Sequence, residues 1–440
     1  MSLCTKFFKM IKGLALLMAC LWSLISFSQV KFSSLQEVLD YADKNSVTAR
    51  QAILQNAIAS TDREITKSGI LPKVSLYGLS EYYPVIATQV IPESIFGGPA
   101  DKFQKVQFGL PFMFAAGAEV SMPVINLEKW AQLEKSKLQQ TQIGWNQAAQ
   151  IEALHIQLTQ WYYQVLLSRA MIELNNENAK IVAQLMVVMQ DRNKTGILNP
   201  SDYNRSRNLQ LDVEAGGPGY AKLEVQAMNA IRSLMNVPDS VSLNISDSLN
   251  GFNWPMLSEN TNIDKRPAWK EAIARVNVAE QAFTESKKSA LPRLSFYGRY
   301  AYTWQIKEAQ TVSYDASTLG LRLDYTLFNG WNIRNQQKKN KLLLESSRLE
   351  QERTKSVLTQ QQKDWWNCYY TAFQTKNTLE NKLQVARENI RIAGLNMKEG
   401  VMEFDEFYNI FLDYVRAKLN HLQNLSDGIL NYVLISNNIQ

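Results

Sequence analysis

Four carboxylates stand close together near the C-terminal end of the sequence. Glu403, Asp405 and Glu406 fall within four consecutive positions, and Asp413 follows one or two helical turns later. Acids of this kind can cap the N-terminus of a helix, where backbone N–H groups lack partners, and they can also attract cations. Capping explains single acids more readily than a cluster. Helix capping alone therefore does not account for these four residues, and we treat them as candidate functional residues.

The other reactive side chains do not form the pattern of an active site. His155 and His421 are the two histidines, and neither has a second ligand at a metal-binding spacing. The sequence contains no phosphate-binding glycine loop and no serine elbow. Cys368 is the only cysteine beyond the N-terminal segment, which excludes an intrachain disulfide and favours a small packed side chain. We expect no enzymatic activity, no cofactor and no bound metal.

The acid cluster follows the second of two very long predicted helices. Residues 127–191 and 332–399 contain no proline and one glycine each. At 1.5 Å per residue, each helix would be roughly 100 Å long. Apolar residues step by three and four along both segments, which is the spacing of helix–helix packing. These seams comprise Ile151, Leu154, Leu158, Trp161 and Val165 in the first helix, and Leu379, Leu383, Ala386 and Ile390 in the second.

Each long helix is predicted to end at a glycine and to be followed by a returning helix. Gly196 and Gly400 suit left-handed C-terminal caps. Asn199 to Asp202 supply turn and N-cap chemistry for the first returning helix. That helix is interrupted by two glycines, a proline and a further glycine, from Gly216 to Gly219. We expect a break or a kink there, because proline lacks the N–H that a helix needs.

Four other segments alternate between apolar and polar residues, which is the period of a strand with one apolar face. They are residues 72–83, 112–124, 292–304 and 318–328. Each has about the 9–11 residues that a tilted strand needs to cross a bilayer. Aromatic residues gather at their ends, as in an interfacial girdle. A soluble sheet with one buried face would give the same alternation.

These helices and strands belong to one pattern that is used twice. An offset of 220 aligns Pro72 with Pro292, and seven identities then fall within sixteen positions. The order helix, strand, loop, strand, long helix, turn, helix also recurs. We assign the first repeat to residues 29–236 and the second to residues 264–440. Residues 237–263 are rich in proline, aspartate, serine and asparagine, and we interpret them as a connector.

Residues 1–28 have the pattern of a secretory signal peptide. Three lysines precede an apolar run from Leu14 to Ile25, and small residues then suit cleavage before Gln29. The run is too short for a membrane anchor. Lipoprotein processing at Cys20 is the alternative. Without the three leader lysines the net charge of +6 falls to +3, and acids and bases are mixed, so we expect no nucleic-acid partner.

Four strands cannot close a barrel by themselves. An open edge in lipid would leave backbone groups unpaired at a cost of several kcal/mol each. If the strands span a membrane, several chains must therefore pool them. Two chains would give about eight strands, and three would give about twelve around a wider, water-filled interior. The strand pattern alone does not choose between these assemblies.

Taken together, these features resemble the TolC-like outer membrane efflux protein family, over essentially the whole chain after the leader. The most specific parts are the duplicated entries to the strands, Leu71-Pro72 with Ser75 and Leu291-Pro292 with Ser295. The exits from the strands, Met122 to Asn126 and Tyr325 to Gly330, are also similar to the family, as is Lys265-Arg266-Pro267 at the start of the second repeat.

The resemblance implies a mainly α protein with membrane β. The expected fold is a homotrimer in which a twelve-stranded β-barrel continues into a long periplasmic α-helical barrel. Its implied function is the outer-membrane exit duct of a tripartite efflux or type I secretion system, which passively conducts substrates. The implied partners are a periplasmic adaptor (membrane fusion) protein, an inner-membrane pump and outer-membrane lipid.

The same resemblance assigns roles to the two helical turns. The acids Glu403, Asp405, Glu406 and Asp413 would surround a periplasmic gate. The tip residues Gly196, Ile197, Asp202, Gly400 and Val401 would contact the adaptor. Some relatives pair such acids with a base, but Met402 occupies the corresponding position here.

A periplasmic coiled-coil adaptor or structural protein without a pore is the alternative. An adaptor would bury its strands in soluble barrels, and it usually keeps an anchor or a lipid at its N-terminus. The leader of this chain is instead predicted to be removed. The transported substrate and the class of pump do not follow from the sequence.

Overall fold

The computed structural model of the chain describes residues 29–249, 251–259, 262–307 and 310–439. The predicted signal peptide and Cys20 lie outside these residues. The described chain divides into two compact units, and each unit takes segments from both repeats. The first comprises Trp145–Glu271, Glu352–Gln440 and the described residues before Asn56, and the second comprises Asn56–Gly144 and Ala272–Gln351.

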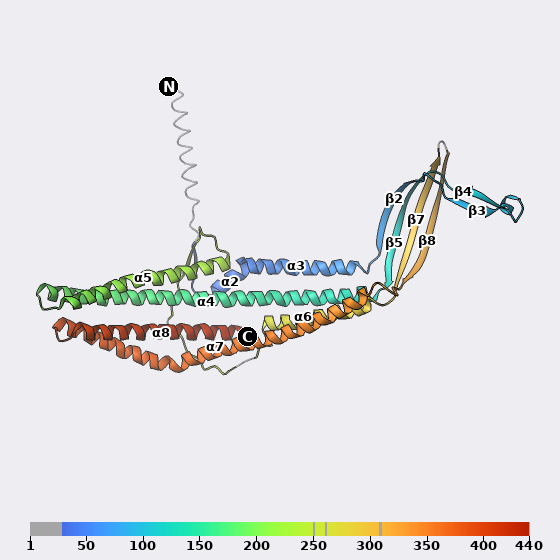
Figure 1. The fold of residues 1–440 in the computed structure, drawn as a ribbon. Coiled ribbons are helices and arrows are strands. Elements are labelled where there is room, and N and C mark those ends of the chain that lie inside the picture. Colours follow the sequence, from blue (N-terminus) through green and yellow to red (C-terminus); the bar gives the residue numbers. More distant parts are fainter. Residues whose placement is uncertain (1–28, 250, 260–261, 308–309, 440) are drawn as a thin grey trace, which may run out of the picture. The chain divides into compact units, whose positions relative to one another are not determined.

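The predicted order of helices and strands is confirmed in both repeats (Figure 1). The corresponding helices of the two repeats also have equal lengths. Helix α3 (Val47–Ser68) and helix α6 (Pro267–Lys288) each have 22 residues. The long helices α4 (Leu127–Lys194) and α7 (Asn332–Glu399) each have 68 residues. The returning helices α5 (Pro200–Met235) and α8 (Phe404–Ile439) each have 36 residues. Each long helix therefore spans about 100 Å.

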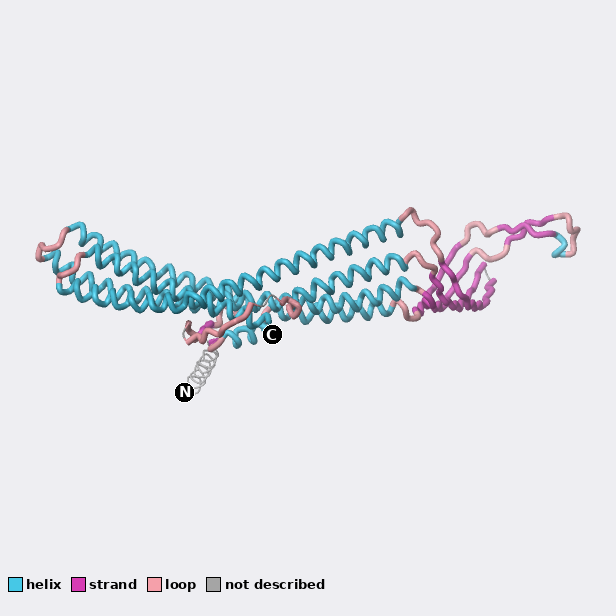
Figure 2. Tube along the Cα trace, turned by 90° about the horizontal axis from the view of Figure 1, so that it is seen from below, coloured by secondary structure: helices cyan, strands magenta, loops and turns pink. Residues whose placement is uncertain are grey.

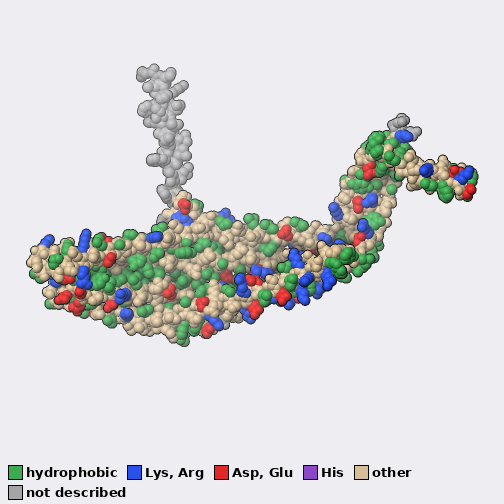
Figure 3. Space-filling view, in the orientation of Figure 1, with side chains coloured by type: hydrophobic (Ala, Val, Ile, Leu, Met, Phe, Trp, Pro, Cys, Tyr) green, Lys and Arg blue, Asp and Glu red, His purple; other side chains and the backbone are tan. Residues whose placement is uncertain are grey.

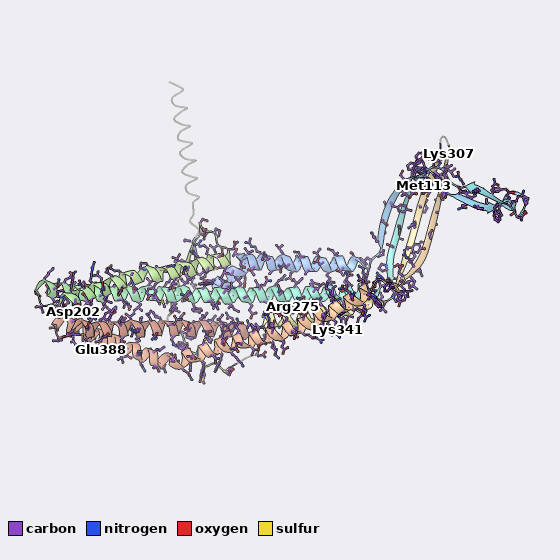
Figure 4. All side chains as sticks on the ribbon, viewed as in Figure 1. Met113, Asp202, Arg275, Lys307, Lys341 and Glu388 are labelled. Carbon is purple, nitrogen blue, oxygen red and sulfur yellow. The ribbon has the colours of Figure 1, made fainter. Side chains whose placement is uncertain are left out.

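The strands of both repeats form one antiparallel sheet in the order β2-β5-β7-β8 (Figure 1). The first repeat contributes β2 (Lys73–Tyr82) and β5 (Phe112–Ile125), and the second contributes β7 (Arg293–Lys307) and β8 (Gln310–Asp324). The register pairs Tyr82 with Phe112 and Phe112 with Ile306. Met113 and Lys307 accordingly lie at the same end of the sheet (Figure 4). Strands β2 and β8 form its two edges.

The last strand is shifted from the prediction of residues 318–328. It begins at Gln310 and ends at Asp324, which pairs with Arg293, the first residue of β7. Residues 325–328 would need partners before Arg293, but Pro292 lacks an N–H group and the residues before it form the turn after α6. The ladder therefore stops with β7.

The sheet has one apolar and one polar face, because neighbouring side chains on a strand point to opposite sides. Side chains on the apolar face include Val74, Leu76, Val120, Leu294, Phe296, Leu319, Leu321 and Leu323, which the register places side by side. Leu76 is 84% exposed and Leu319 is 77% exposed. The polar face carries Glu119 and Arg299, which form an ion pair across neighbouring strands at 3.3 Å. Among the described residues, nothing covers these leucines of the apolar face.

On the polar face, a tyrosine lies over a glycine of the next strand, once in each repeat. A Cβ atom at Gly117 would come within 2.8 Å of the Tyr77 ring, and one at Gly320 would come within 2.7 Å of the Tyr297 ring. Only glycine leaves room for a ring to lie this close to a neighbouring strand. This pairing is a second, structural sign of the duplication.

A two-stranded extension of the first repeat was not predicted. Strands β3 (Thr88–Pro92) and β4 (Phe103–Gln107) pair with each other between β2 and β5, with the short 3-10 helix η1 (Glu93–Phe96) at their tip. Figure 2 shows this hairpin in magenta, continuing beyond the four main strands. In the second repeat, β7 ends at Lys307 and β8 begins at Gln310.

The helical core of the first unit contains the buried faces of α4, α5, α7 and α8. Helix α2 (Leu35–Asn45) packs there too, and β1 (Gln29–Phe32) pairs in parallel with β6 (Ser242–Ile245) of the connector.

The predicted seam of α4 is wrong at Trp161, which is 39% exposed. The stripe advances by four residues from Leu158 to Tyr162, which is fully buried, and the Tyr162 hydroxyl donates to Asp247 at 2.7 Å. Cys368 was expected to pack but is exposed.

The predicted break in the first returning helix does not occur. Helix α5 runs through Gly216 and Pro218 without interruption. Asn175 of α4 donates its side-chain amide to the carbonyl of Val213 at 3.1 Å, beside the carbonyl that Pro218 leaves without its usual donor. Cβ atoms at Gly216 and Gly217 would lie 2.9 and 3.2 Å from the Asn175 side chain. The glycines therefore make room for a polar side chain that bonds to the weakened turn.

Candidate functional site

The two helical turns have the predicted cap geometry. Gly196 follows α4 with φ of 71°, and Gly400 follows α7 with φ of 82°, so both adopt the left-handed conformation that glycine tolerates best. Asn199 caps α5 by accepting the backbone N–H of Ser201 at 2.9 Å. Each turn reverses the chain and brings a returning helix back along the long one (Figure 1).

The four acids of the second turn are exposed in this chain. Glu403 immediately precedes α8, Asp405 and Glu406 lie in its first turn, and Asp413 lies further along it. Asp405 forms an ion pair with Arg205, which comes from α5 of the first repeat. This contact supplies the basic partner that was missing at Met402, whose side chain is buried instead. The cluster is thus connected to the other helical turn.

Arg205 is the centre of a small network between the two returning helices. Its guanidinium group lies 5.7 Å from the centre of the Phe404 ring and 3.9 Å from the carboxylate of Asp202 on its own helix. The hydrogen bond to Asp405 raises the pKa of Arg205 above its usual value. Asp202, a candidate adaptor contact, therefore also helps to hold Arg205 in place.

A second contact joins the long helices at their ends. Arg192 of α4 donates to the backbone carbonyl of Met397 in the last turn of α7, at 2.5 Å. The usual donor to that carbonyl would be the N–H of Val401, which bonds to Asn396 instead. A Cβ atom at Gly400 would lie 3.2 Å from the arginine, so glycine also permits its approach.

An aromatic and thioether core lies beneath these contacts. Met189 of α4, Met397 of α7, and Phe407 and Phe411 of α8 are all at most 2% exposed. The two phenylalanine rings stack with their centres 6.5 Å apart. This core fixes the backbone from which the exposed acids and arginines project.

A cavity of about 490 Å³ lies next to this core, between α4, α7 and α8. Its lining includes Glu177, Arg387 and Tyr414. The Tyr414 hydroxyl donates to Glu177 at 3.2 Å. Burial, with a further contribution from Glu177, raises the pKa of Tyr414. The space between the helices is therefore partly polar.

The tips themselves expose apolar side chains. Ile197 is 80% exposed and Val401 is 75% exposed, each directly after the capping glycine of its turn. These two residues, with Gly196, Gly400 and Asp202, are the positions expected to contact an adaptor. The structure brings all five to the ends of the helical hairpins in the first unit. An exposed isoleucine and valine at a tight turn are suited to a protein contact.

The described residues contain no group of three or more histidine, cysteine, aspartate or glutamate side chains arranged to hold a metal ion. His155 bonds to Asp43 at 2.7 Å.

No helix in the described part of the chain is both long and apolar enough to cross a membrane.

The fold is similar to that of solved outer-membrane channels. The chain matches the outer-membrane channel OprN with a TM-score of 0.77 and 14% identity, over 92% of this chain and 89% of that one. It matches the CmeC outer membrane channel of Campylobacter jejuni with 0.73 and 14%, over 92% and 85%. It matches the outer membrane protein VceC of Vibrio cholerae with 0.70 and 11%, over 92% and 95%. No family model and no curated protein matches the sequence.

The expected fold of the single chain is thereby confirmed. The duplicated unit of helix, two strands, long helix and returning helix is the architecture of these channels. The matched proteins are channels rather than enzymes.

Proposed function

We propose that this chain is one subunit of a homotrimeric exit duct in the cell outer membrane. It passively conducts substrates that an inner-membrane pump and a periplasmic adaptor deliver, as part of a tripartite efflux or type I secretion system. Its helices form the periplasmic tunnel, and its strands cross the membrane. The observation that carries the proposal is the four-stranded sheet, which has one exposed apolar face and two free edges.

The sheet has the dimensions and chemistry of a membrane-spanning segment. Strands β7 and β8 have 15 residues each. With a rise of about 3.4 Å per residue and a tilt of about 45°, they would span about 36 Å, enough for the roughly 30 Å hydrocarbon core. In lipid the edges β2 and β8 must find partners, since unpaired backbone groups are costly there. Three chains would supply twelve strands and close the barrel.

The helices also carry surfaces that a second copy would cover. Ile58 and Ile65 of α3 are 58% and 62% exposed, and Leu342 and Leu349 of α7 are 56% and 64% exposed. Each pair is spaced by seven residues, which is the repeat of helices that pack side by side. These stripes support an assembly in which the helices of neighbouring chains complete the tunnel.

The helical turns suit a gate and a docking site. The contacts of Arg192 with Met397 and of Arg205 with Asp405 tie the hairpin of the first repeat to that of the second. We infer that these links hold a closed entrance, and that Glu403, Asp405, Glu406 and Asp413 give the entrance its preference for cations. Ile197 and Val401, with the glycines beside them and Asp202, would meet the adaptor.

The test is conductance. Purified oligomers carrying Arg192→Met and Arg205→Met, which remove both links and keep all four acids, are expected to give discrete conductance steps with cation preference in a planar bilayer. Correctly assembled oligomers of this variant that never conduct would refute the channel. They would favour the alternative, a periplasmic coiled-coil adaptor or structural protein without a pore.

The partner is tested by cross-linking in cells. A photo-reactive residue at Ile197 or Val401 is expected to capture a periplasmic adaptor. The same residue at Val225, an apolar position on α5 that is 58% exposed, serves as the control. Equal capture from all three positions would contradict docking at the tips.

A further inference from the structure

A stripe of positive charge runs along the first turns of α7. Arg334, Lys338 and Lys341 follow one another at intervals of four and three residues, so they share one face of the helix. All three side chains are exposed. We call these three residues the basic stripe. Figure 3 shows blue side chains gathered over α6 and the start of α7, and Figure 4 places Lys341 there.

No acid neutralises the basic stripe. Residues 332–344 contain no aspartate or glutamate, and no salt bridge joins the three cations to an acid within the part of the chain that the structure describes. Lysines of α4 in the same unit behave differently. Lys135 pairs with Glu285 at 2.5 Å, and Lys137 pairs with Glu134 at 2.9 Å. The basic stripe is therefore an uncompensated charge.

The stripe lies beside the packed side of its helix. Gln337 and Asn340 bind the backbone of α6, donating to the carbonyls of Ser286 at 3.2 Å and Ala282 at 3.1 Å. At about 100° per residue, Asn340 lies about 120° around α7 from Arg334, and Gln337 lies about 60° from it, yet all three cations of the stripe stay exposed. Lys287 of α6 adds a cation beside it and lies 4.1 Å from the centre of the Phe283 ring. A charged surface so placed is available to a partner outside the chain.

Aromatic side chains connect the basic stripe to the apolar face of the sheet. Phe328 and Trp331 lie between β8 and α7, are 70% and 59% exposed, and contact each other edge to face at 5.7 Å. Arg334 lies 5.4 Å above the Trp331 ring. Along the chain the exposed residues thus change from leucines on β8, to aromatic rings, to cations. This is the order of hydrocarbon, interface and headgroup in a bilayer.

We propose that the basic stripe binds anionic phospholipid headgroups, in the leaflet that faces the helices. The inference rests on the proposed function, since it requires the strands to span a membrane. From Arg334 to Lys341 the helix rises about 10 Å. The headgroup layer is roughly 5–8 Å thick on each side, and flexible lysine stems extend the reach of the charges. Clustered cations beside a membrane span attract anionic lipid through their summed charge.

The experiment compares lipids bound to the purified, full-length oligomer. The protein is equilibrated in detergent micelles with equal phosphatidylglycerol and phosphatidylcholine, and native mass spectrometry counts the bound lipids. We expect an excess of phosphatidylglycerol that decreases with salt. Arg334→Gln with Lys338→Gln and Lys341→Gln should reduce this excess at least tenfold, because each cation contributes up to about fivefold at low salt. The pair Lys338→Arg and Lys341→Arg, which keeps the charge, should retain it.

The matched control removes three exposed lysines elsewhere, by Lys180→Gln, Lys222→Gln and Lys363→Gln. It should keep the wild-type excess. No excess in the wild type, an equal loss in the control, or displacement by inorganic phosphate at the lipid concentration would each overturn the proposal. So would failure of the stripe variant alone to assemble, because the stripe would then pack against another copy.

Conductance of the same preparations separates this inference from the proposed function. Oligomers that conduct but show no lipid preference refute the basic stripe as a lipid site and leave the channel intact. Oligomers that never conduct in the open variant, yet prefer phosphatidylglycerol, refute the channel and leave lipid binding standing.

Discussion

The contact between Arg192 and the Met397 carbonyl allows the proposed gate to be tested quantitatively. Arg192→Met removes the charged donor but keeps a long side chain on α4. A hydrogen bond from a charged group contributes about 1.5–3 kcal/mol, and the half-exposed setting of Arg192 reduces this to about 1–2 kcal/mol. If the contact exists only in the closed entrance, the ratio of closed to open channels should fall about 5- to 30-fold.

The assay is the open fraction of single oligomers in a planar bilayer. Arg207→Met is the matched control, because Arg207 lies on α5 near the same tip and donates to Gln210 of its own helix at 2.7 Å. We expect the control to behave as the wild type. An open fraction that is the same in both variants would show that the Arg192 contact is present in both states or in neither, and would refute the role of this link.

Three further predictions concern the acids, the sheet and the pH dependence of stability. Asp405→Asn with Glu406→Gln should lower the cation over anion selectivity, measured from reversal potentials in a salt gradient; unchanged selectivity and leak would reduce these acids to helix caps. Gly320→Val should destabilise the sheet by about 1–3 kcal/mol, since its Cβ would lie 2.7 Å from a tyrosine ring, whereas Gly78→Val meets nothing within 4 Å and should be tolerated in thermal unfolding of the oligomer. Burial raises the pKa of Asp427, and this effect exceeds the lowering by its hydrogen bond to a nearby glutamine. At pH values above the raised pKa, the ionised carboxylate therefore destabilises the folded protein. This cost disappears at pH values below the pKa of Asp427 in the unfolded chain. Asp427→Asn should therefore raise the unfolding temperature near pH 7 but not near pH 3, and an equal gain at both values would contradict this account.

The repeated architecture could be predicted because its signals are local. A proline and a tyrosine at a constant offset, a glycine after each long helix and the alternation along each strand all act within a few residues. Periodicity is therefore visible without the partner that each face packs against. The boundaries depended on partner strands. Strand β8 ends at Asp324 because its partner there, Arg293, is the first residue of β7, although the alternation of β8 itself continues further.

The contacts of the candidate site were not visible, because they join residues about 200 positions apart. The pattern around Met402 suggested that the acids lacked a base, yet Arg205 approaches them from the other repeat. Similarly, Gly216 and Pro218 predict a broken helix by themselves, and only the position of Asn175 explains why α5 continues. A single sequence carries no information on which distant side chain fills a local defect.

Aromatic residues within the helices were equally ambiguous. Trp161 and Tyr162 are neighbours, and heptad spacing alone favoured the tryptophan for the packed stripe. The tyrosine is buried because its hydroxyl finds Asp247 in the connector, whereas no such partner can be inferred from the spacing.

The equal lengths of the paired helices restrict how such a protein can change during evolution. A deletion of seven residues from α4 alone would shorten that helix by about 10.5 Å and would withdraw Arg192 from Met397. The same deletion would have to occur in α7, and nearly the same in both returning helices, before the tips met again. Insertions in the loop between β2 and β5 face no such demand, and that is where the first repeat carries its additional hairpin. Variation in length among related sequences should therefore accumulate in the loops beyond the strands. The lengths of the paired helices should change only together.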